Sequence, residues 1–171
     1  MSPTGSYLEI DGRPALRFVR EYDHPADRVF AMLTDPDELA HWFPARVAPA
    51  AGWTRGAPIT FTFEADGDGG GGEVLAHEPP HRVGFSWGGE QLWFEVETLR
   101  DGRTRLTFTH LMDERDGASR NAAGWDLCLD ALDGALAGTP GGAPGGRTPA
   151  WEELYEAYVA AGVPSGAPIP G

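Results

Sequence analysis

The sequence predicts an α+β fold in which a curved antiparallel sheet wraps around one long C-terminal helix. Between Trp53 and Met112, apolar and polar residues alternate with a period of two, which is typical of strands that bury one face. Between Ser119 and Ala137 the apolar residues instead follow a helical period and form one stripe. A sheet with one apolar face and a helix with one apolar stripe bury each other by packing together.

Length and charge narrow the class of protein. The chain has 171 residues, 41% of them hydrophobic, which suffices for one core without disulfides. Its net charge of −13 repels nucleic-acid phosphates and anionic lipids, so we expect neither nucleic acid nor a membrane as a partner. No apolar run approaches the ~20 residues of a membrane span. Since no signal peptide is recognisable in residues 1–12, we expect a cytoplasmic protein.

The first elements follow from local patterns. Residues 1–14 are polar and predict a loose lead-in, whereas residues 15–22 alternate as a first strand. Pro25 suits the first position of a short helix. A second short helix is predicted by residues 35–38, which resemble a capping box with Asp35 as the cap.

The second helix should carry Trp42 and Phe43 before Pro44 ends it. Alternating residues then predict strands near 59–63, 73–78, 82–87, 92–97 and 104–110. The Gly- and Asp-rich stretch 66–72 predicts a flexible turn between two of these strands. Short connections between successive strands favour an antiparallel meander.

The C-terminal part is predicted to lie outside the main domain of residues 15–137. Residues 138–147 form a linker rich in Gly and Pro. An additional helix over 148–162 and a tail over 163–171 follow it.

The chain carries a series of short motifs in a definite order: residues 25–30, 33–36, 42–43, 78–83, 85–87, 104–110 and 124–125. In this order they resemble the helix-grip domains of the START-like superfamily, which includes birch-pollen-allergen-like proteins and polyketide cyclases. Within it they resemble the branch named for activators of the ninety-kilodalton heat-shock protein ATPase. The eukaryotic co-chaperone has a further N-terminal domain, for which this chain leaves no room, so we do not expect its stimulating activity here.

The resemblance implies a space between the sheet and the long helix. We expect it to bind a small, largely apolar molecule without catalysis and without a cofactor, because large rings occupy many inward-facing positions. For each of them the alternative is simple packing in the core. The candidate lining residues are Trp42, Phe43, Phe61, Phe63, Phe85, Trp87, Phe94, Phe108, His110, Trp125 and Leu129.

Two other functions stay open. An aromatase/cyclase-type enzyme acting on a polyketide would use His110 or Glu97 as acid or base, although Glu97 has the outward parity. His110 combined with His41 and Asp35 is a further acid–base set that no spacing rule supports. A co-chaperone-like interaction module or a homodimer would use the final helix.

The contact residues of such a homodimer would be Trp151, Tyr155 and Tyr158. No metal site is expected, because the histidines lack ligand spacing and the Asp66–Asp68 run lacks that of a calcium loop. Cys128 lies on the apolar stripe and is predicted to be a buried hydrophobe.

Overall fold

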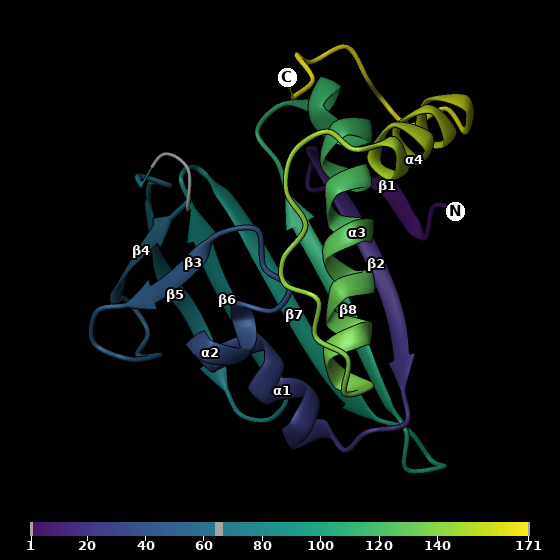
Figure 1. Cartoon of the computed structure of the whole chain (residues 1–171). Helices are drawn as coiled ribbons and strands as arrows, with labels where there is room; N and C mark the ends of the chain where they lie inside the picture. Colours follow the sequence, from purple (N-terminus) through teal and green to yellow (C-terminus); the bar gives the residue numbers. More distant parts are fainter. Residues whose placement is uncertain (1, 64–66, 171) are drawn as a thin grey trace.

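An eight-stranded antiparallel sheet curves around one long helix in the computed structural model, which describes residues 2–63 and 67–170. Neighbouring strands follow the order β1-β2-β8-β7-β6-β5-β4-β3 (Figure 1). The strands are β1 (Gly5–Ile10), β2 (Arg13–Tyr22), β3 (Arg46–Pro49), β4 (Pro58–Thr62), β5 (Gly71–Glu78), β6 (Arg82–Trp87), β7 (Glu90–Thr98) and β8 (Thr104–Leu111). The helices are α1 (Ala26–Thr34), α2 (Pro36–Leu39), α3 (Ala118–Leu136) and α4 (Pro149–Ala160). This arrangement confirms the predicted fold class.

The predicted loose lead-in is wrong, because residues 5–10 form β1 and pair with β2. Asp11 and Gly12 make the connecting turn with φ angles of 52° and 78°. A two-residue hairpin turn with positive φ at both positions favours an Asp-Gly pair. That dipeptide was the available signal for the missed strand.

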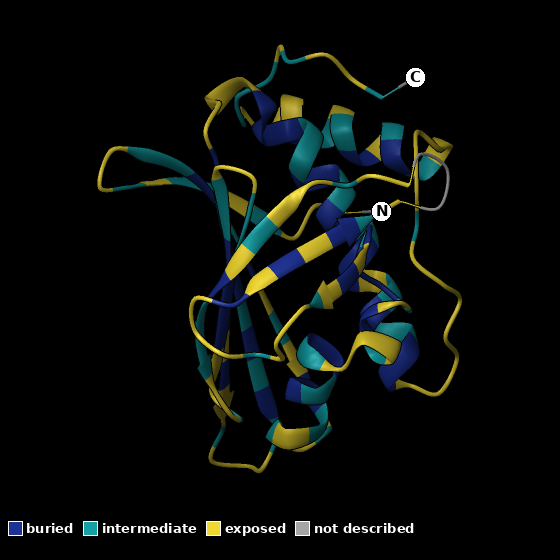
Figure 2. Cartoon of the chain, turned by 90° about the vertical axis from the view of Figure 1, so that its left-hand side faces the viewer, coloured by how far each residue is buried: buried dark blue, intermediate teal, exposed yellow. Residues whose placement is uncertain are grey.

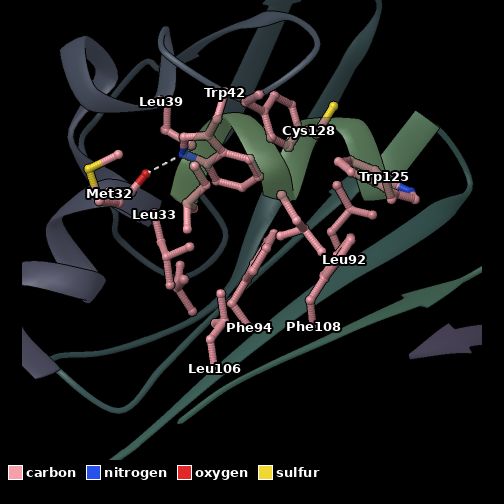
Figure 3. Packing of buried hydrophobic residues seen from close by; sticks show 14 of the residues in the cluster. Met32, Leu33, Leu39, Trp42, Leu92, Phe94, Leu106, Phe108, Trp125 and Cys128 are labelled. Atoms are coloured by element: carbon pink, nitrogen blue, oxygen red, sulfur yellow. Dashed lines mark hydrogen bonds between the residues drawn. The ribbon is translucent and has the colours of Figure 1, made fainter. Parts of the chain in front are cut away.

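The second short helix ends earlier than expected. Asp35 caps α2 as predicted, since its Oδ1 accepts a hydrogen bond of 3.0 Å from the Asp37 backbone N–H. The helix stops at Leu39, and Trp42 and Phe43 lie in the turns after it. The Trp42 indole N–H donates to the Met32 carbonyl oxygen over 2.8 Å, which holds the ring inward against α1 (Figure 3).

The meander confirms the predicted strands and adds β3, a four-residue strand that was not expected. In the Gly- and Asp-rich turn, Asp66 lies outside the described residues, whereas Gly71 and Gly72 already belong to β5. The register between β7 and β8 sets Phe94 opposite Phe108 and Leu92 opposite His110. Side chains from β7 and β8 therefore meet on the concave face.

The core lies between this concave face and α3. Phe94 stacks on Phe108 with ring centroids 4.5 Å apart, and Trp125 of α3 meets Phe108 edge-on at 4.7 Å. Figure 3 shows these rings together with Trp42 between the sheet and the helix. In Figure 2 the buried residues gather where the sheet and the helices face one another.

The final helix packs against α3. Trp151 and Leu154 of α4 form a small buried cluster with Ala123 of α3. The linker before α4 runs alongside α3 in Figure 1. Within the described part of the chain, no helix combines the length and the apolar character needed to cross a membrane.

Candidate functional site

An open pocket of about 930 Å³ lies between the N-terminal half of α3 and the neighbouring ends of β6, β7 and β8. Rings and aliphatic groups from the sheet and from α3 form one part of its wall. The linker and α4 complete it through Pro144, Gly145, Gly146 and Trp151. The segment expected to be a mere connector therefore contributes to the wall of the pocket.

Four of the candidate residues line this pocket: Phe63, Trp87, His110 and Trp125. The other candidates fill the interior beside it, each at most 1% exposed: Trp42, Phe43, Phe61, Phe85, Phe94, Phe108 and Leu129. Their rings contact one another, as Phe43 does with Phe61 at 6.2 Å and with Phe85 at 5.9 Å. The space between the sheet and α3 is thus packed at its centre and opens at one end.

A chain of hydrogen bonds joins three pocket residues. The Trp125 indole N–H donates to Nδ1 of His110 over 2.9 Å, and Nε2 of His110 lies 2.8 Å from Oε1 of Glu90. An indole nitrogen can only donate, so Nδ1 of His110 must be the acceptor. The proton of the neutral ring then sits on Nε2 and points at the Glu90 carboxylate.

This arrangement bears on the enzyme hypothesis. A general base needs a free lone pair within reach of its substrate, and both nitrogens of His110 are already hydrogen-bonded. Glu97 lies on the exposed side of the sheet, 3.7 Å from the Arg105 guanidinium. Asp35 serves as a helix cap and not as a partner of His110. In this arrangement the lone pair of the neutral imidazole is taken by the Trp125 indole N–H.

Glu90 is one of the pocket residues that were not predicted from the sequence. It precedes Leu92 by two positions and so shares the inward parity of that strand, which was the available signal. Partial burial would raise its pKa, but hydrogen bonds from His110 and from the Asp113 backbone N–H lower it below the ordinary 4.5. The carboxylate is therefore held in its charged form inside the pocket.

Glu90 should make the stability of the fold dependent on pH. A group whose pKa is lower in the folded than in the unfolded chain stabilises the fold above its unfolded pKa, and this contribution is lost as the pH falls through the folded value. Urea unfolding of the wild type and of Glu90→Gln should be compared near neutrality and in mild acid. We expect a smaller loss of stability in acid for the variant, and equal losses would contradict this role.

Cys128 lines the same pocket and is 3% exposed. Burial raises the pKa of its thiol to about 12, so the reactive thiolate is scarce at neutral pH. We expect alkylation by iodoacetamide to be on the order of a thousandfold slower than for an exposed thiol. The same reaction in urea is the control, and equal rates in both conditions would show that the thiol is not protected.

Of the three residues proposed for a homodimer contact, Trp151 and Tyr158 are buried within the chain and Tyr155 is partly buried. Trp151 is 4% exposed and Tyr158 is 1% exposed, while Tyr155 stacks on Trp151 at 5.1 Å. The Tyr158 hydroxyl donates to Asp126 of α3 and accepts from the Gly5 backbone N–H of β1. A dimer through the final helix would have to use another of its faces.

The titratable groups show no sign of a metal centre in the described ranges. There, no three side chains of His, Cys, Asp or Glu converge on a point where an ion could be held. The Asp66–Asp68 run is described only in part, since Asp66 lies outside those ranges.

Comparisons with solved structures agree on the fold. CalU16 from Micromonospora echinospora is 20% identical with a TM-score of 0.69, over 93% of this chain and 96% of that one. A conserved protein of unknown function, EF2215 from Enterococcus faecalis, is 16% identical with a TM-score of 0.72, over 92% and 89%. The Aha1 dimer from Colwellia psychrerythraea is 23% identical with a TM-score of 0.59, over 71% and 95%. No curated protein sequence matches the chain.

A family model covers most of the helix-grip region. It is described as Activator of Hsp90 ATPase homolog 1-like protein and matches residues 23–137, from the turn before α1 to the end of α3. The match includes the short motifs on which the resemblance was based and excludes β1 and α4. This chain therefore belongs to the family of Activator of Hsp90 ATPase homolog 1-like proteins.

Proposed function

We propose that this protein binds a small, largely apolar molecule in the pocket between α3 and the sheet, without catalysing a reaction on it. The observation that carries the proposal is the composition of the pocket wall. The rings of Trp87, Trp125 and Trp151 and the side chain of Leu92 line the pocket together with the polar side chains of Glu90, His110, Asp113, Glu114, Arg120 and Asn121. Ligand sites of small molecules are typically apolar hollows of about 300–1,000 Å³ with few polar groups.

A binding role agrees better with the polar groups than an enzymatic role does. His110 is held between a donor and an acceptor, which fixes its ring and leaves no free nitrogen for proton transfer. Glu90 is the carboxylate at the inner wall, and its oxygens accept hydrogen bonds from His110 and from the Asp113 backbone N–H. Groups fixed in this way can orient a ligand. The cyclase alternative would require His110 to release Trp125 or Glu90.

Gly124 offers a way to test the proposal. It lines the pocket from α3, and a Cβ added there would have the Trp151 indole nitrogen, at 4.0 Å, as its nearest neighbour. A larger side chain at this position therefore starts from the pocket wall beside Trp151, which lines the same pocket. Replacing Gly inside a helix also favours the helix, by up to about 1 kcal/mol for Ala.

Nile red is a suitable probe, because it is uncharged and fluoresces strongly in apolar surroundings. We expect it to bind the wild type and Gly124→Ala alike, and to bind Gly124→Leu on the order of tenfold or more weakly, as misfits in apolar sites do. The Ala variant controls for the change in helix propensity. Equal binding by all three proteins, or no binding by any, would contradict the proposal.

A further inference from the structure

The hydrogen-bond donors of the inner pocket wall already have acceptors within the chain. The Trp125 indole N–H donates to His110, which in turn donates to Glu90. The Trp87 indole N–H donates to the Gly69 carbonyl oxygen over 2.7 Å. A ligand carboxylate or phosphate needs donors, and one that bound at these three side chains would have to break these bonds.

The acceptors of the pocket, in contrast, have capacity left. A carboxylate has about four lone-pair positions. Each oxygen of Glu90 accepts one hydrogen bond, of 2.8 Å from His110 and of 3.0 Å from the Asp113 backbone N–H. Asp113 and Glu114 add two further carboxylates to the lining, and both are exposed. The wall is therefore suited to a ligand group that donates hydrogen bonds.

The charges of the wall favour a cation. Among the described lining residues, Arg120 is the one arginine, against the three carboxylates of Glu90, Asp113 and Glu114. Arg120 donates to the Asn121 side chain over 3.3 Å and to the Pro168 carbonyl oxygen over 2.9 Å. Arg13 lies beside Asp113 at 3.1 Å and offsets part of the negative charge there. His110 donates to Glu90 through Nε2 while its Nδ1 accepts from Trp125.

The apolar part of the wall suits the same ligand. Trp87, Trp125 and Trp151 line the pocket. The face of an aromatic ring attracts a cation that lies within about 6 Å of its centre. The carboxylates and the indole rings of the wall therefore both favour a ligand that carries a positive charge.

We propose that the ligand of this pocket carries a protonated amine on an apolar, ring-containing body, and that the pocket selects against carboxylates of the same shape. The inference rests on the proposed function, since it names the chemical class of the molecule bound there. In this arrangement the ammonium lies beside Glu90 and the apolar body lies against the tryptophan rings. The carboxylates act both through charge and as hydrogen-bond acceptors.

Three probes with one ring system separate charge from shape: 1-naphthalenemethylamine, 1-naphthalenemethanol and 1-naphthoic acid. Isothermal titration calorimetry with the wild type should give the tightest binding for the amine and the weakest for the acid. We expect the amine and the acid to differ about tenfold or more, because one is attracted and the other repelled by partly buried carboxylates. Higher ionic strength should reduce the preference for the amine and leave the binding of the alcohol unchanged.

Two variants test which carboxylates of the lining cause the preference for the amine over the alcohol. Glu114→Gln removes an exposed charge from the lining and should reduce the ratio of amine to alcohol affinity. Glu90→Gln should reduce it further, because Glu90 is the more buried of the two. Glu97→Gln is the matched control, since it removes the same charge from the outward side of the sheet and should leave the ratio unchanged.

The outcomes distinguish the two proposals. Binding of the acid as tightly as the amine, or of the amine no more tightly than the alcohol, would overturn the assignment of an ammonium ligand and leave the proposed binding function standing. A ratio that falls as much in Glu97→Gln as in Glu114→Gln would also overturn the assignment. Failure of all three probes to bind would overturn the proposed function itself.

Discussion

Replacing Trp42 by Ala is expected to lower the free energy of unfolding by about 4 kcal/mol, at the large end for single substitutions. Trp42 is fully buried. Its ring meets Phe43 at 5.6 Å and Phe94 at 6.0 Å, both edge-on. The substitution leaves a cavity among these rings and removes the hydrogen bond to the Met32 carbonyl oxygen. Trp42 therefore connects the turn after α2 to the concave face of the sheet.

Urea unfolding followed by circular dichroism measures this effect. Trp93→Ala is the matched control, because it makes the same chemical change on a half-buried ring of the outer face. That ring lies against the Arg82 guanidinium at 4.4 Å, and its loss should cost about 1 kcal/mol. Comparable losses in the two variants would show that Trp42 is not part of the rigid core.

The second large effect is expected at Asp126, which is 2% exposed and joins three elements. Its carboxylate accepts hydrogen bonds from the Tyr158 hydroxyl of α4 and from Thr4 beside β1. It also lies 3.2 Å from the Arg20 guanidinium of β2. Asp126→Ala removes these interactions together and leaves the buried Tyr158 hydroxyl without its acceptor. We expect a loss of about 3 kcal/mol.

Hydrogen exchange resolves where this loss occurs. The amides of α4 and β1 should exchange faster in Asp126→Ala, because the carboxylate that joins them to α3 is gone. Asp130→Ala is the control: Asp130 lies 2.9 Å from the same Arg20, its side chain is 44% exposed, and its loss should cost less than about 1 kcal/mol. Unchanged exchange in α4 of Asp126→Ala would refute the role of Asp126 in holding this helix.

Asp126 and Asp130 differ in burial in a way that the helical period of α3 does not predict. The helical period correctly predicts that Trp125 and Leu129 face the sheet, and it places Asp126 and Asp130 on the opposite side of α3. That side is solvent for Asp130, whereas α4 and β1 cover Asp126. Periodicity within one helix carries no information about a second layer that another segment adds. The burial of Asp126 therefore could not be predicted from α3 alone.

The sequence predicted only part of the candidate site, and the reason is related. Inward parity correctly directs Phe94, Phe108 and His110 to the concave face. Parity does not tell which of these side chains touch one another and which border an opening. The rings of Phe94 and Phe108 stack with their centroids 4.5 Å apart, whereas His110 lies beside the N-terminal half of α3, where the pocket opens. Glu90 could have been found from the same parity, but its charge argued against an inward position.

The proposed function requires that the open end between α3 and the sheet holds a small molecule. Native mass spectrometry of the protein purified from its own host detects such a molecule. We expect an additional mass retained by the wild type and by Gly124→Ala and absent from Gly124→Leu, whose larger side chain starts from the pocket wall beside Trp151. The same mass retained by Gly124→Leu, or no retained molecule on any of the three proteins, would contradict it.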